Sequence, residues 1–321
     1  MPDGLTALES LGVSVTNEDS FPIRGIRFLS GGTGVTAAFP DGASGRGVRR
    51  TVLHRLMAER AASIGIELLW QSAVTGVSPE GVHLANRTVK ARWIIGADGG
   101  NSRLRRWAGL DQFRQRDCRY AFRRHYRVAP WTDHMELHWG LRGEVYVTPV
   151  SNEQVCVALI SRDPKLRLDE ALGGFPELQK RLAGAERASS ERGALTATCS
   201  LNRVSRGNIA LIGDASGTVD AITGEGLCLA FSQAMVLAEC LRSGDLGRYE
   251  REHQRLAFRP LLMSRLMLLL DGRPRLQRRT IQVFGSQPHI FQRFLELHVG
   301  VLSPLRLAMN GLNLGWGLLT V

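Results

Sequence analysis

Two aspartates of this chain occupy the same kind of position, each after a short apolar segment and among glycines. Asp214 follows residues 209–213 (IALIG), and Asp98 follows residues 93–97 (WIIGA). Short continuous apolar runs are typical of strands covered on both faces of a mostly parallel sheet. Open α/β sheets bind ligands at the carboxyl ends of their strands, where a carboxylate can accept hydrogen bonds from a ribose or another polyol. We therefore predict a ligand site there; the alternative is an ordinary strand–loop–helix joint with a solvent-exposed Asp.

The glycines downstream of Asp214 predict the amino end of a helix. Gly224, Glu225 and Gly226 precede apolar residues at helical spacing, namely Leu227, Phe231, Ala234, Leu237 and Leu241. Free N–H groups and the positive end of the helix dipole favour an electron-rich ligand at such a place. After Asp98, Gly99 opens a similar turn that places Ser102 and Arg105 on the next helix.

Further elements are expected on the amino-terminal side of these turns. Residues 49–65 (RRTVLHRLMAERAASIG) predict a helix with an apolar face and a glycine stop, and residues 66–77 (IELLWQSAVTGV) predict a strand. Gly32 to Ala37 spell G-x-G-x-x-A, a form of the dinucleotide fingerprint. A helix has to begin inside that fingerprint, but Pro40 follows too soon, so residues 26–39 predict a β-hairpin instead.

Composition limits the function classes. The 321 residues include 44% hydrophobic and 22% charged side chains, as in a globular α/β protein, and the net charge of +11 favours anionic partners. Five scattered cysteines without a C-x-x-C pair fit a reduced, cytoplasmic compartment and no zinc site. Residues 260–270 and 297–321 are apolar segments that also carry arginine. We expect them to form helices packed against the rest of the protein; the alternative is peripheral contact with a membrane. No nucleic-acid-binding module accompanies the basic residues.

Residues 110–200 are rich in β signals and predict a substrate-covering domain. In RYAFRRHYRV, alternation places Arg119, Arg123, His125 and Arg127 on one strand face, which we expect to be solvated unless it recognises an anionic substrate. In HMELHW, His134, Glu136 and His138 share one side of a strand, which we expect to be a polar surface row and not a metal site.

Taken in order along the chain, three motifs resemble those of the FAD-dependent aromatic hydroxylases and their relatives. Residues 95–105 (IGADGGNSRLR) resemble the family's D-G-x-x-S-x-x-R motif, residues 209–226 resemble its G-D motif, and Arg50 stands where the family has a flavin-contacting arginine. The resemblance implies that Asp214 binds the ribityl chain and that Gly224 to Gly226 back the flavin ring. It also implies that Asp98 and Arg50 bind the ribityl–pyrophosphate region and that Val74 lies near the adenine. The remaining cofactor-binding residues that it implies are Gly99, Ser102, Arg105, Gly213 and Glu225.

Departures from the hydroxylase pattern open a second interpretation. Gly217, Asp220 and Ala221 replace the family's His and Pro positions, and Cys228 replaces a usual Asn. The segment GDASGTVDAITGEG is closer to the geranylgeranyl-reductase branch. The halogenase signature W-x-W-x-I-P does not occur in the sequence.

The resemblance implies an α/β (α+β overall) fold: an FAD/NAD(P)-binding Rossmann-like domain, an inserted antiparallel β-sheet and carboxyl-terminal helices. Because the family begins with a strand and a true G-x-G-x-x-G turn, we expect this Rossmann-like domain to be truncated at its amino terminus. The expected segments are residues 1–109 and 201–245 for the FAD-binding domain, 110–200 for the β-rich substrate domain and 246–321 for the helical region.

The function implied by the resemblance is FAD-dependent oxidoreduction. The first version is a monooxygenase (hydroxylase) with FAD and NAD(P)H, and the second is a geranylgeranyl reductase-like enzyme reducing an alkene of a small-molecule or lipid-like substrate. The alternative to an enzyme is a truncated, non-catalytic binding module. The sequence identifies no catalytic acid or base; Asp220, Tyr146 and His125 are polar side chains that could line a site.

Overall fold

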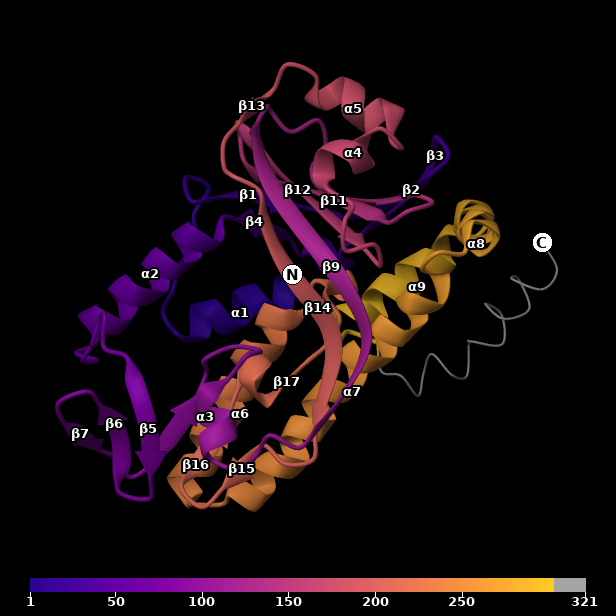
Figure 1. Cartoon of the computed structure of the whole chain (residues 1–321). Coiled ribbons are helices and arrows are strands. Elements are labelled where there is room, and N and C mark those ends of the chain that lie inside the picture. The colour runs from indigo at the N-terminus through magenta and orange to yellow at the C-terminus, as the bar shows by residue number, and fades with distance from the viewer. Residues whose placement is uncertain (303–321) are drawn as a thin grey trace. The chain divides into compact units, whose positions relative to one another are not determined.

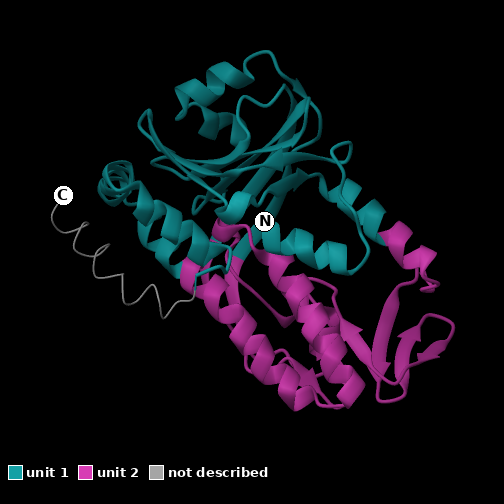
Figure 2. Ribbon diagram, turned by 180° about the vertical axis from the view of Figure 1, so that it is seen from behind, with its two compact units in different colours: residues 1–57, 119–196, 265–321 teal, residues 58–118, 197–264 magenta. Residues whose placement is uncertain are grey.

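The computed structural model describes residues 1–302 (Figure 1). The chain divides into two compact units, residues 1–57, 119–196 and 265–321, and residues 58–118 and 197–264 (Figure 2). We call them unit 1 and unit 2 and describe each by itself. The apolar segment at residues 297–321, for which packing or membrane contact was predicted, lies mostly outside the described residues. Among residues 1–302, no helix is long and apolar enough to cross a membrane.

Unit 1 contains a large sheet in which the order of strands is β9-β12-β11-β10-β2-β3. All neighbours in this order are antiparallel except β10 and β2, which are parallel. Its elements, some continuing into unit 2, are α1 (Pro2–Ser10), β1 (Ser20–Ile23), β2 (Gly25–Ser30), β3 (Thr33–Ala38), η1 (Pro40–Gly42), β4 (Gly45–Val48), α2 (Arg50–Ser63), β9 (Phe113–Arg127), β10 (His134–Trp139), β11 (Glu144–Ser151), β12 (Gln154–Ser161), α4 (Leu168–Leu172), α5 (Pro176–Leu182), β13 (Glu186–Arg187), β14 (Arg192–Leu201), α7 (Leu246–Leu270), α8 (Pro274–Ser286) and α9 (Pro288–His298). The predicted β-rich character of residues 110–200 is confirmed.

Alternation along the central strands of this sheet builds the core of unit 1. Val145 and Val147 of β11 and Val155, Val157 and Leu159 of β12 are at most 1% exposed. They pack in one apolar cluster with residues of α4 and α5, including Leu168, Leu172, Leu178 and Leu182. The period of two in the sequence therefore directs one face of the strands inward, as expected for an antiparallel sheet covered on that side.

The G-x-G-x-x-A segment is part of a β-hairpin, as predicted. β2 and β3 pair antiparallel with Ser30 opposite Thr33, so Gly31 and Gly32 form a two-residue loop. Both glycines have positive φ, 58° and 82°, which a hairpin turn of this kind requires and which side chains disfavour. No helix begins within this segment, so it is not the dinucleotide fingerprint.

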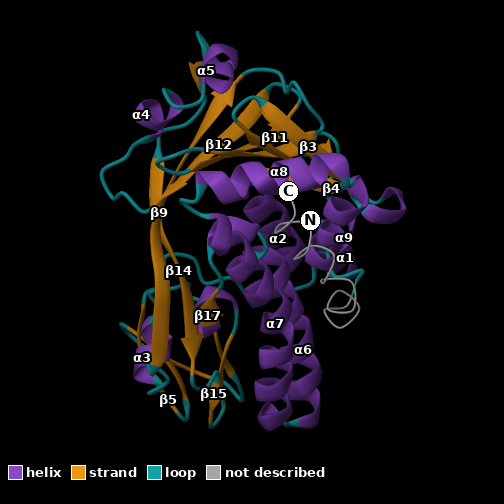
Figure 3. Ribbon diagram, turned by 90° about the vertical axis from the view of Figure 1, so that its right-hand side faces the viewer, coloured by secondary structure: helices purple, strands orange, loops and turns teal. Residues whose placement is uncertain are grey.

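Unit 2 is built around two short parallel strands. Its elements are β5 (Val74–Ser78), β6 (Gly81–Leu84), β7 (Thr88–Lys90), β8 (Ile94–Gly96), α3 (Arg103–Trp107), β15 (Ser205–Arg206), β16 (Ile209–Leu211), η2 (Gly213–Ser216), β17 (Gly217–Thr218), η3 (Ala221–Thr223), α6 (Gly226–Ser243) and the first part of α7. β8 and β16 pair in parallel, and all three residues of β16 are buried. α6 and the first part of α7 run alongside each other (Figure 3) and share a core with both strands through Leu237, Cys240 and Tyr249. The buried parallel strand predicted at residues 209–212 is confirmed.

The prediction of a strand over residues 66–77 is wrong for residues 66–73. The structure forms only β5 (Val74–Ser78), and Ile66, Leu69 and Trp70 are 52%, 42% and 61% exposed. Among residues 1–302, no strand pairs with residues 66–73, and extended backbone needs such a partner to satisfy its N–H and C=O groups. The preceding helix is confirmed as α2, but only Leu53 of its predicted apolar face is buried.

The prediction of a solvated face in residues 119–127 is correct for Arg123 and Arg127, which are exposed, and wrong for Arg119 and His125. The prediction of a polar surface row in residues 134–138 is wrong at Glu136. Arg119 is fully buried, with Nη1 3.6 Å from Glu144 Oε2 and 3.8 Å from Asp271 Oδ2, and His125 is 5% exposed. Glu136 is 2% exposed and accepts hydrogen bonds from Trp131 Nε1 at 3.0 Å and His138 Nε2 at 3.1 Å. Alternation identifies the face of a strand but cannot reveal that buried charges on that face have partners from other elements. Among residues 1–302, no three His, Cys, Asp or Glu side chains gather as a metal site would require.

The close packing of β8 on β16 and α3 gives a first testable prediction. A Cβ placed on Gly96 would lie 2.6 Å from Leu211 Cδ2 and 2.8 Å from Leu104 Cδ2. We expect Gly96→Ala to lower the free energy of unfolding by about 1–3 kcal/mol, as overpacking of a core does. Urea denaturation measures this.

The matched control is Gly76→Ala in β5 of the same unit. A Cβ there would meet only His83 Cδ2 at 3.5 Å, an ordinary contact. We expect its effect to stay within about 0.5 kcal/mol. Equal stability of the wild type and Gly96→Ala would show that β8 can move away from α3 without cost.

Candidate functional site

Asp98 and Asp214, the two predicted aspartates, lie just beyond the carboxyl ends of the two parallel strands β8 and β16. Gly96 of β8 is opposite Leu211 of β16, so Asp98 and Asp214 follow neighbouring strand ends by two and three residues. Both side chains are exposed. Gly99 and Gly213 have positive φ, 79° and 58°, which lets the chain turn sharply at each strand end. Sequence reasoning placed these residues together, and the structure does so.

Asp98 is held by the helix that follows it. Its carboxylate accepts hydrogen bonds from Ser102 Oγ at 2.5 Å and from the backbone N–H groups of Arg103 at 2.8 Å and Leu104 at 3.1 Å. Burial acts to raise the pKa of Asp98, but the hydrogen bonds from Ser102, Leu104 and Arg103 together hold it below its usual range. Asp98 is therefore ionised at neutral pH and satisfies N–H groups at the start of α3.

Arg105 connects the two strand-end turns. Its side chain is almost fully buried, and its guanidinium donates to Gly100 O at 2.9 Å, Ala215 O at 3.3 Å and Asp111 Oδ1 at 2.9 Å. Gly100 belongs to the turn after β8, and Ala215 to the turn after β16. The planar fork of arginine suits such a bridge, because its N–H groups point in several fixed directions. Direct cofactor contact by Arg105 stays a prediction, whereas its bridging role is visible in the structure.

The turn after β16 is also held from the helical side, by residues that sequence reasoning missed. Gly213 N–H donates to Gln233 Oε1 at 2.7 Å, and Ser216 Oγ donates to Gly213 O at 2.8 Å. Gln233 Nε2 lies 3.0 Å from His253 Nε2, and Ser216 Oγ lies 2.9 Å from the same nitrogen. Since Gln233 Oε1 accepts from Gly213, its amide N–H₂ must face His253, whose Nε2 is then an acceptor.

A neutral His253 is consistent with its surroundings. Burial lowers the pKa of His253 to about 4, so the ring carries no charge at neutral pH. The only sequence signal for this network was the polar residue Gln233 in the mostly apolar first part of α6. Its partner His253 lies on α7 and could not be paired with it from the sequence.

The loop before α6 leaves open space above its glycines. Gly224 has a φ of 67°, and a Cβ added to Gly224 or Gly226 would meet no atom within 4 Å. Asp220 Oδ1 accepts from Ile222 N–H at 2.9 Å, and Glu225 is 3% exposed with Oε1 3.4 Å from Arg259 Nη2. Polar side chains thus fix the loop from within, while the space beside its glycine backbone is open. The prediction that α6 begins at these glycines is confirmed.

A groove of about 590 Å³ runs beside the free edge of β8. Ile94 N–H and Gly96 C=O bond toward β16, so the N–H and C=O of Ile95 point to the other side, and its side chain is 36% exposed. The groove brings together Val74 and Asp98, two predicted site residues. Its lining consists of Ala73, Val74, Val82, Trp93, Ile94, Ile95, Gly96, Ala97, Asp98, Arg103, Leu104 and Trp107.

The remaining candidates lie elsewhere or are engaged with protein groups. Arg50 belongs to unit 1, where it is exposed at the start of α2. Tyr146 donates to Glu144 Oε2 at 3.3 Å, and His125 Nδ1 lies 3.1 Å from Ser189 Oγ, both within unit 1. The role of Arg50 at a cofactor therefore stays a prediction.

The bridge made by Arg105 can be tested by a substitution that keeps its charge. A lysine has one ammonium group and cannot reach three acceptors in different directions. We expect Arg105→Lys to lower the free energy of unfolding by about 1.5–3 kcal/mol and to speed amide exchange at residues 213–216. Hydrogen exchange with mass spectrometry measures the second effect. Arg106→Lys, an exposed position on the same helix, is the control, and unchanged exchange in Arg105→Lys would contradict the bridge.

The buried histidines predict how stability depends on pH. Burial lowers the pKa of His253 to about 4, and burial together with the charges of Arg49 and Arg123 lowers that of His125 to about 4. In the unfolded chain both have a pKa near about 6.5, so between these values the unfolded state binds more protons than the folded state. The stability they contribute is complete above about pH 6.5 and is lost as the pH falls toward about 4.

Urea denaturation between pH about 7 and about 4.5 measures this loss, above the range in which most carboxylates titrate. His253→Gln removes one of the two titrating groups and should flatten the pH dependence. A wild type with the same free energy of unfolding at both ends of the range would contradict the assignment of neutral, buried histidines.

Comparison with known proteins places this chain in a family. Residues 46–244 match the family model described as an FAD binding domain. The chain is 26% identical over 239 residues to a digeranylgeranylglycerophospholipid reductase of Methanocella arvoryzae, covering 64% of this chain and 59% of the relative. It is 28% identical over 274 residues to a menaquinone reductase of Mycobacterium tuberculosis, covering 77% of this chain and 67% of the relative.

The fold of this chain is similar to a solved structure over more of its length than the sequence matches cover. The structure of a flavoprotein/dehydrogenase from Cytophaga hutchinsonii superposes with a TM-score of 0.80 at 17% identity, covering 94% of this chain and 82% of the other. The chain spans about three fifths of the length of the archaeal relatives. The matched residues include both strand-end turns and the start of α6. The chain belongs to the FAD binding domain family.

Proposed function

We propose that this chain acts as an FAD-dependent oxidoreductase. The observation that carries the proposal is the pair of glycine-rich turns at neighbouring strand ends, joined by Arg105, within a chain of the FAD binding domain family. Parallel strands that end in such turns bring hydroxyl-binding carboxylates and free backbone groups to one edge of a sheet. FAD supplies the redox chemistry of such an enzyme, and the protein binds it, orients it and excludes water.

The residues present fit the cofactor. Asp214 is an exposed carboxylate at a strand end, suited to accept hydrogen bonds from the ribityl hydroxyls. The open space above Gly224 and Gly226 can admit the flat ring system, and the positive end of the α6 dipole favours its electron-rich edge. Asp98 and Arg50 would serve the ribityl–pyrophosphate region and Val74 the adenine, while Gly99, Ser102 and Gly213 shape the turns.

For the reaction, we propose the reduction of a carbon–carbon double bond in a lipid-like substrate, with NADH or NADPH as electron donor. Two observations support it: the reductases among the relatives and the GDASGTVDAITGEG segment of Gly213–Gly226. Such a reaction adds two hydrogen atoms across the double bond, with the electrons coming from the nicotinamide donor. Hydroxylation is the second candidate, favoured by the intact D-G-x-x-S-x-x-R residues Asp98, Ser102 and Arg105.

Mass spectrometry of products separates the two reactions and the non-catalytic alternative. The chain is incubated with FAD, NADPH or NADH, and either digeranylgeranylglycerol phospholipid or menaquinone. Reduction adds about 2 Da for each double bond, whereas insertion of oxygen adds about 16 Da. We expect the first result. Bound flavin without either product would favour a binding module, and absence of flavin binding would overturn the proposal.

The assignment of Asp214 predicts the effect of its removal. If its carboxylate accepts hydrogen bonds from ribityl hydroxyls, Asp214→Ala leaves those hydroxyls without a partner, which costs about 1.5–3 kcal/mol of binding. The affinity for FAD would fall roughly 10- to 100-fold. Flavin fluorescence titration measures this, with far-UV circular dichroism to confirm folding.

Glu18→Ala is the matched control, because Glu18 is an exposed carboxylate in unit 1, outside the three motifs. It should bind FAD like the wild type. Equal affinity of Asp214→Ala and the wild type would mean that Asp214 is only a turn residue.

A further inference from the structure

Helix α8 presents two faces of opposite character. Its buried residues include Gln277, Thr280, Ile281, Val283 and Phe284, and the helix packs on β2 and β3 of unit 1. Its exposed face carries Arg275, Arg278, Arg279 and Gln282, which we call the α8 stripe. Spacings of three, four and seven residues place these side chains on one side of a helix. Three cations are therefore concentrated over two turns.

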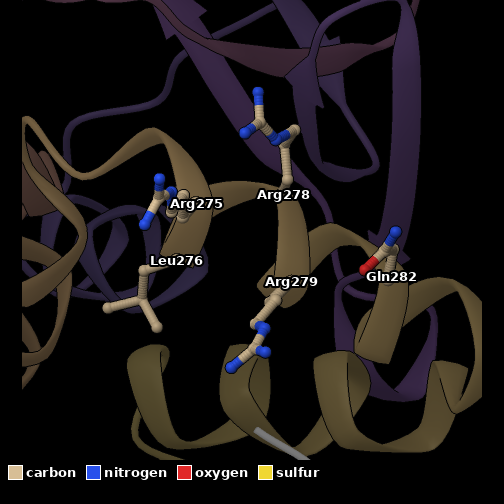
Figure 4. Close-up of a pocket in the computed structure, with 5 residues that line it drawn as sticks. All are labelled: Arg275, Leu276, Arg278, Arg279 and Gln282. Carbon is tan, nitrogen blue, oxygen red and sulfur yellow. The ribbon is translucent and has the colours of Figure 1, made fainter. Parts of the chain in front are cut away.

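The α8 stripe borders a hollow of about 610 Å³, which Leu276 completes (Figure 4). In the described part of the chain, no carboxylate lines this hollow. Within residues 1–302, none of its three arginines forms an ion pair, whereas Arg105, Arg119 and Arg124 all have carboxylate partners. The positive charge of the α8 stripe is thus not neutralised by the residues that the structure describes.

The positive charge of Arg275 also lies at the amino end of α8, where the helix dipole is itself positive. Arg275 lies in the first turn of α8, which has no acidic residue, and the N-cap residue Arg273 makes no side-chain capping hydrogen bond. An acidic or capping side chain at this end would stabilise the helix, because the amino end of a helix is positive. An external anion would interact favourably with both the arginines and this helix end.

The arrangement of the guanidinium groups favours an extended anionic surface over one small ion. In Figure 4, Arg278 and Arg279 extend in opposite directions and Arg275 lies to one side of both. Half-buried Leu276 lies among them, and Leu269, near the end of the preceding helix, is 52% exposed. Basic and apolar side chains together are typical of surfaces that bind the headgroup region of a bilayer.

We propose that the α8 stripe binds the phosphate groups of anionic phospholipids at a membrane surface. Among the described residues, no aromatic side chain on which a nucleic-acid base could stack lines the hollow, so nucleic acid fits it less well. The proposal concerns attachment to a bilayer and goes beyond the redox reaction. It requires no bound flavin, so its failure and that of the oxidoreductase proposal can be told apart.

Vesicle flotation tests the proposal with the full chain. The probes are vesicles of phosphatidylcholine alone and vesicles containing about 30% phosphatidylglycerol. The variant is Arg275→Gln/Arg278→Gln/Arg279→Gln. Each basic residue near an anionic surface contributes about fivefold to partitioning, so we expect roughly 100-fold weaker binding to the anionic vesicles and little binding of any form to the neutral ones.

The matched control is Arg114→Gln/Arg116→Gln/Arg251→Gln, which changes the net charge equally at exposed positions of unit 2. It should bind anionic vesicles within about twofold of the wild type. An equal loss in both triple variants would overturn the proposal in favour of overall charge. If the triple α8 variant does not fold by circular dichroism, Arg278→Gln alone should show about a fivefold loss, and its absence would overturn the proposal.

Two competitors separate the other sources of negative charge. At constant ionic strength, inorganic phosphate should not displace the protein from the vesicles; displacement would indicate a pocket for a free anion instead. A short DNA duplex should bind the wild type and the triple α8 variant alike. Loss of duplex binding with unchanged vesicle binding would overturn the proposal in favour of nucleic acid.

Discussion

The guanidinium of Arg105 is the interaction on which the candidate site depends. It joins Gly100 O and Ala215 O, two carbonyl groups that are far apart in the sequence, and its charge is matched by Asp111. Removing it would take this donor away from the carbonyl of the buried residue Ala215, and the loss of a hydrogen bond is costly away from water. The two carboxylates proposed to face the cofactor, Asp98 and Asp214, lie in the turns that this residue connects.

Other contacts restrain the same two turns from different directions. Asp98 is fixed by N–H groups of α3, and Gly213 is fixed by Gln233 of α6, which in turn contacts His253 of α7. Each turn is therefore held by side chains on regular elements and not only by its own backbone. Sites supported in this way are positioned more accurately than sites on unsupported loops.

Much of the fold was predictable because it follows from patterns local in the sequence. The buried strand before Asp214, the β2–β3 hairpin and the start of α6 at the glycines follow from apolar periodicity and turn residues. The bridge of Arg105 and the Gln233–His253 pair were not predictable, because each joins side chains to partners on separate elements. The strand expected at residues 66–73 failed for a related reason: apolar character does not supply a pairing partner.

The free edge of β8 has a consequence for handling the protein. Ile95 directs its N–H and C=O away from β16 into an apolar groove, and no strand among residues 1–302 pairs with that edge. An unpaired strand edge of this kind is a template on which another extended chain can add. Here Ile94 and Gly96 are flanked by Trp93 and Ala97, and none of these carries a charge. We therefore expect intermolecular strand addition at this edge to increase with protein concentration.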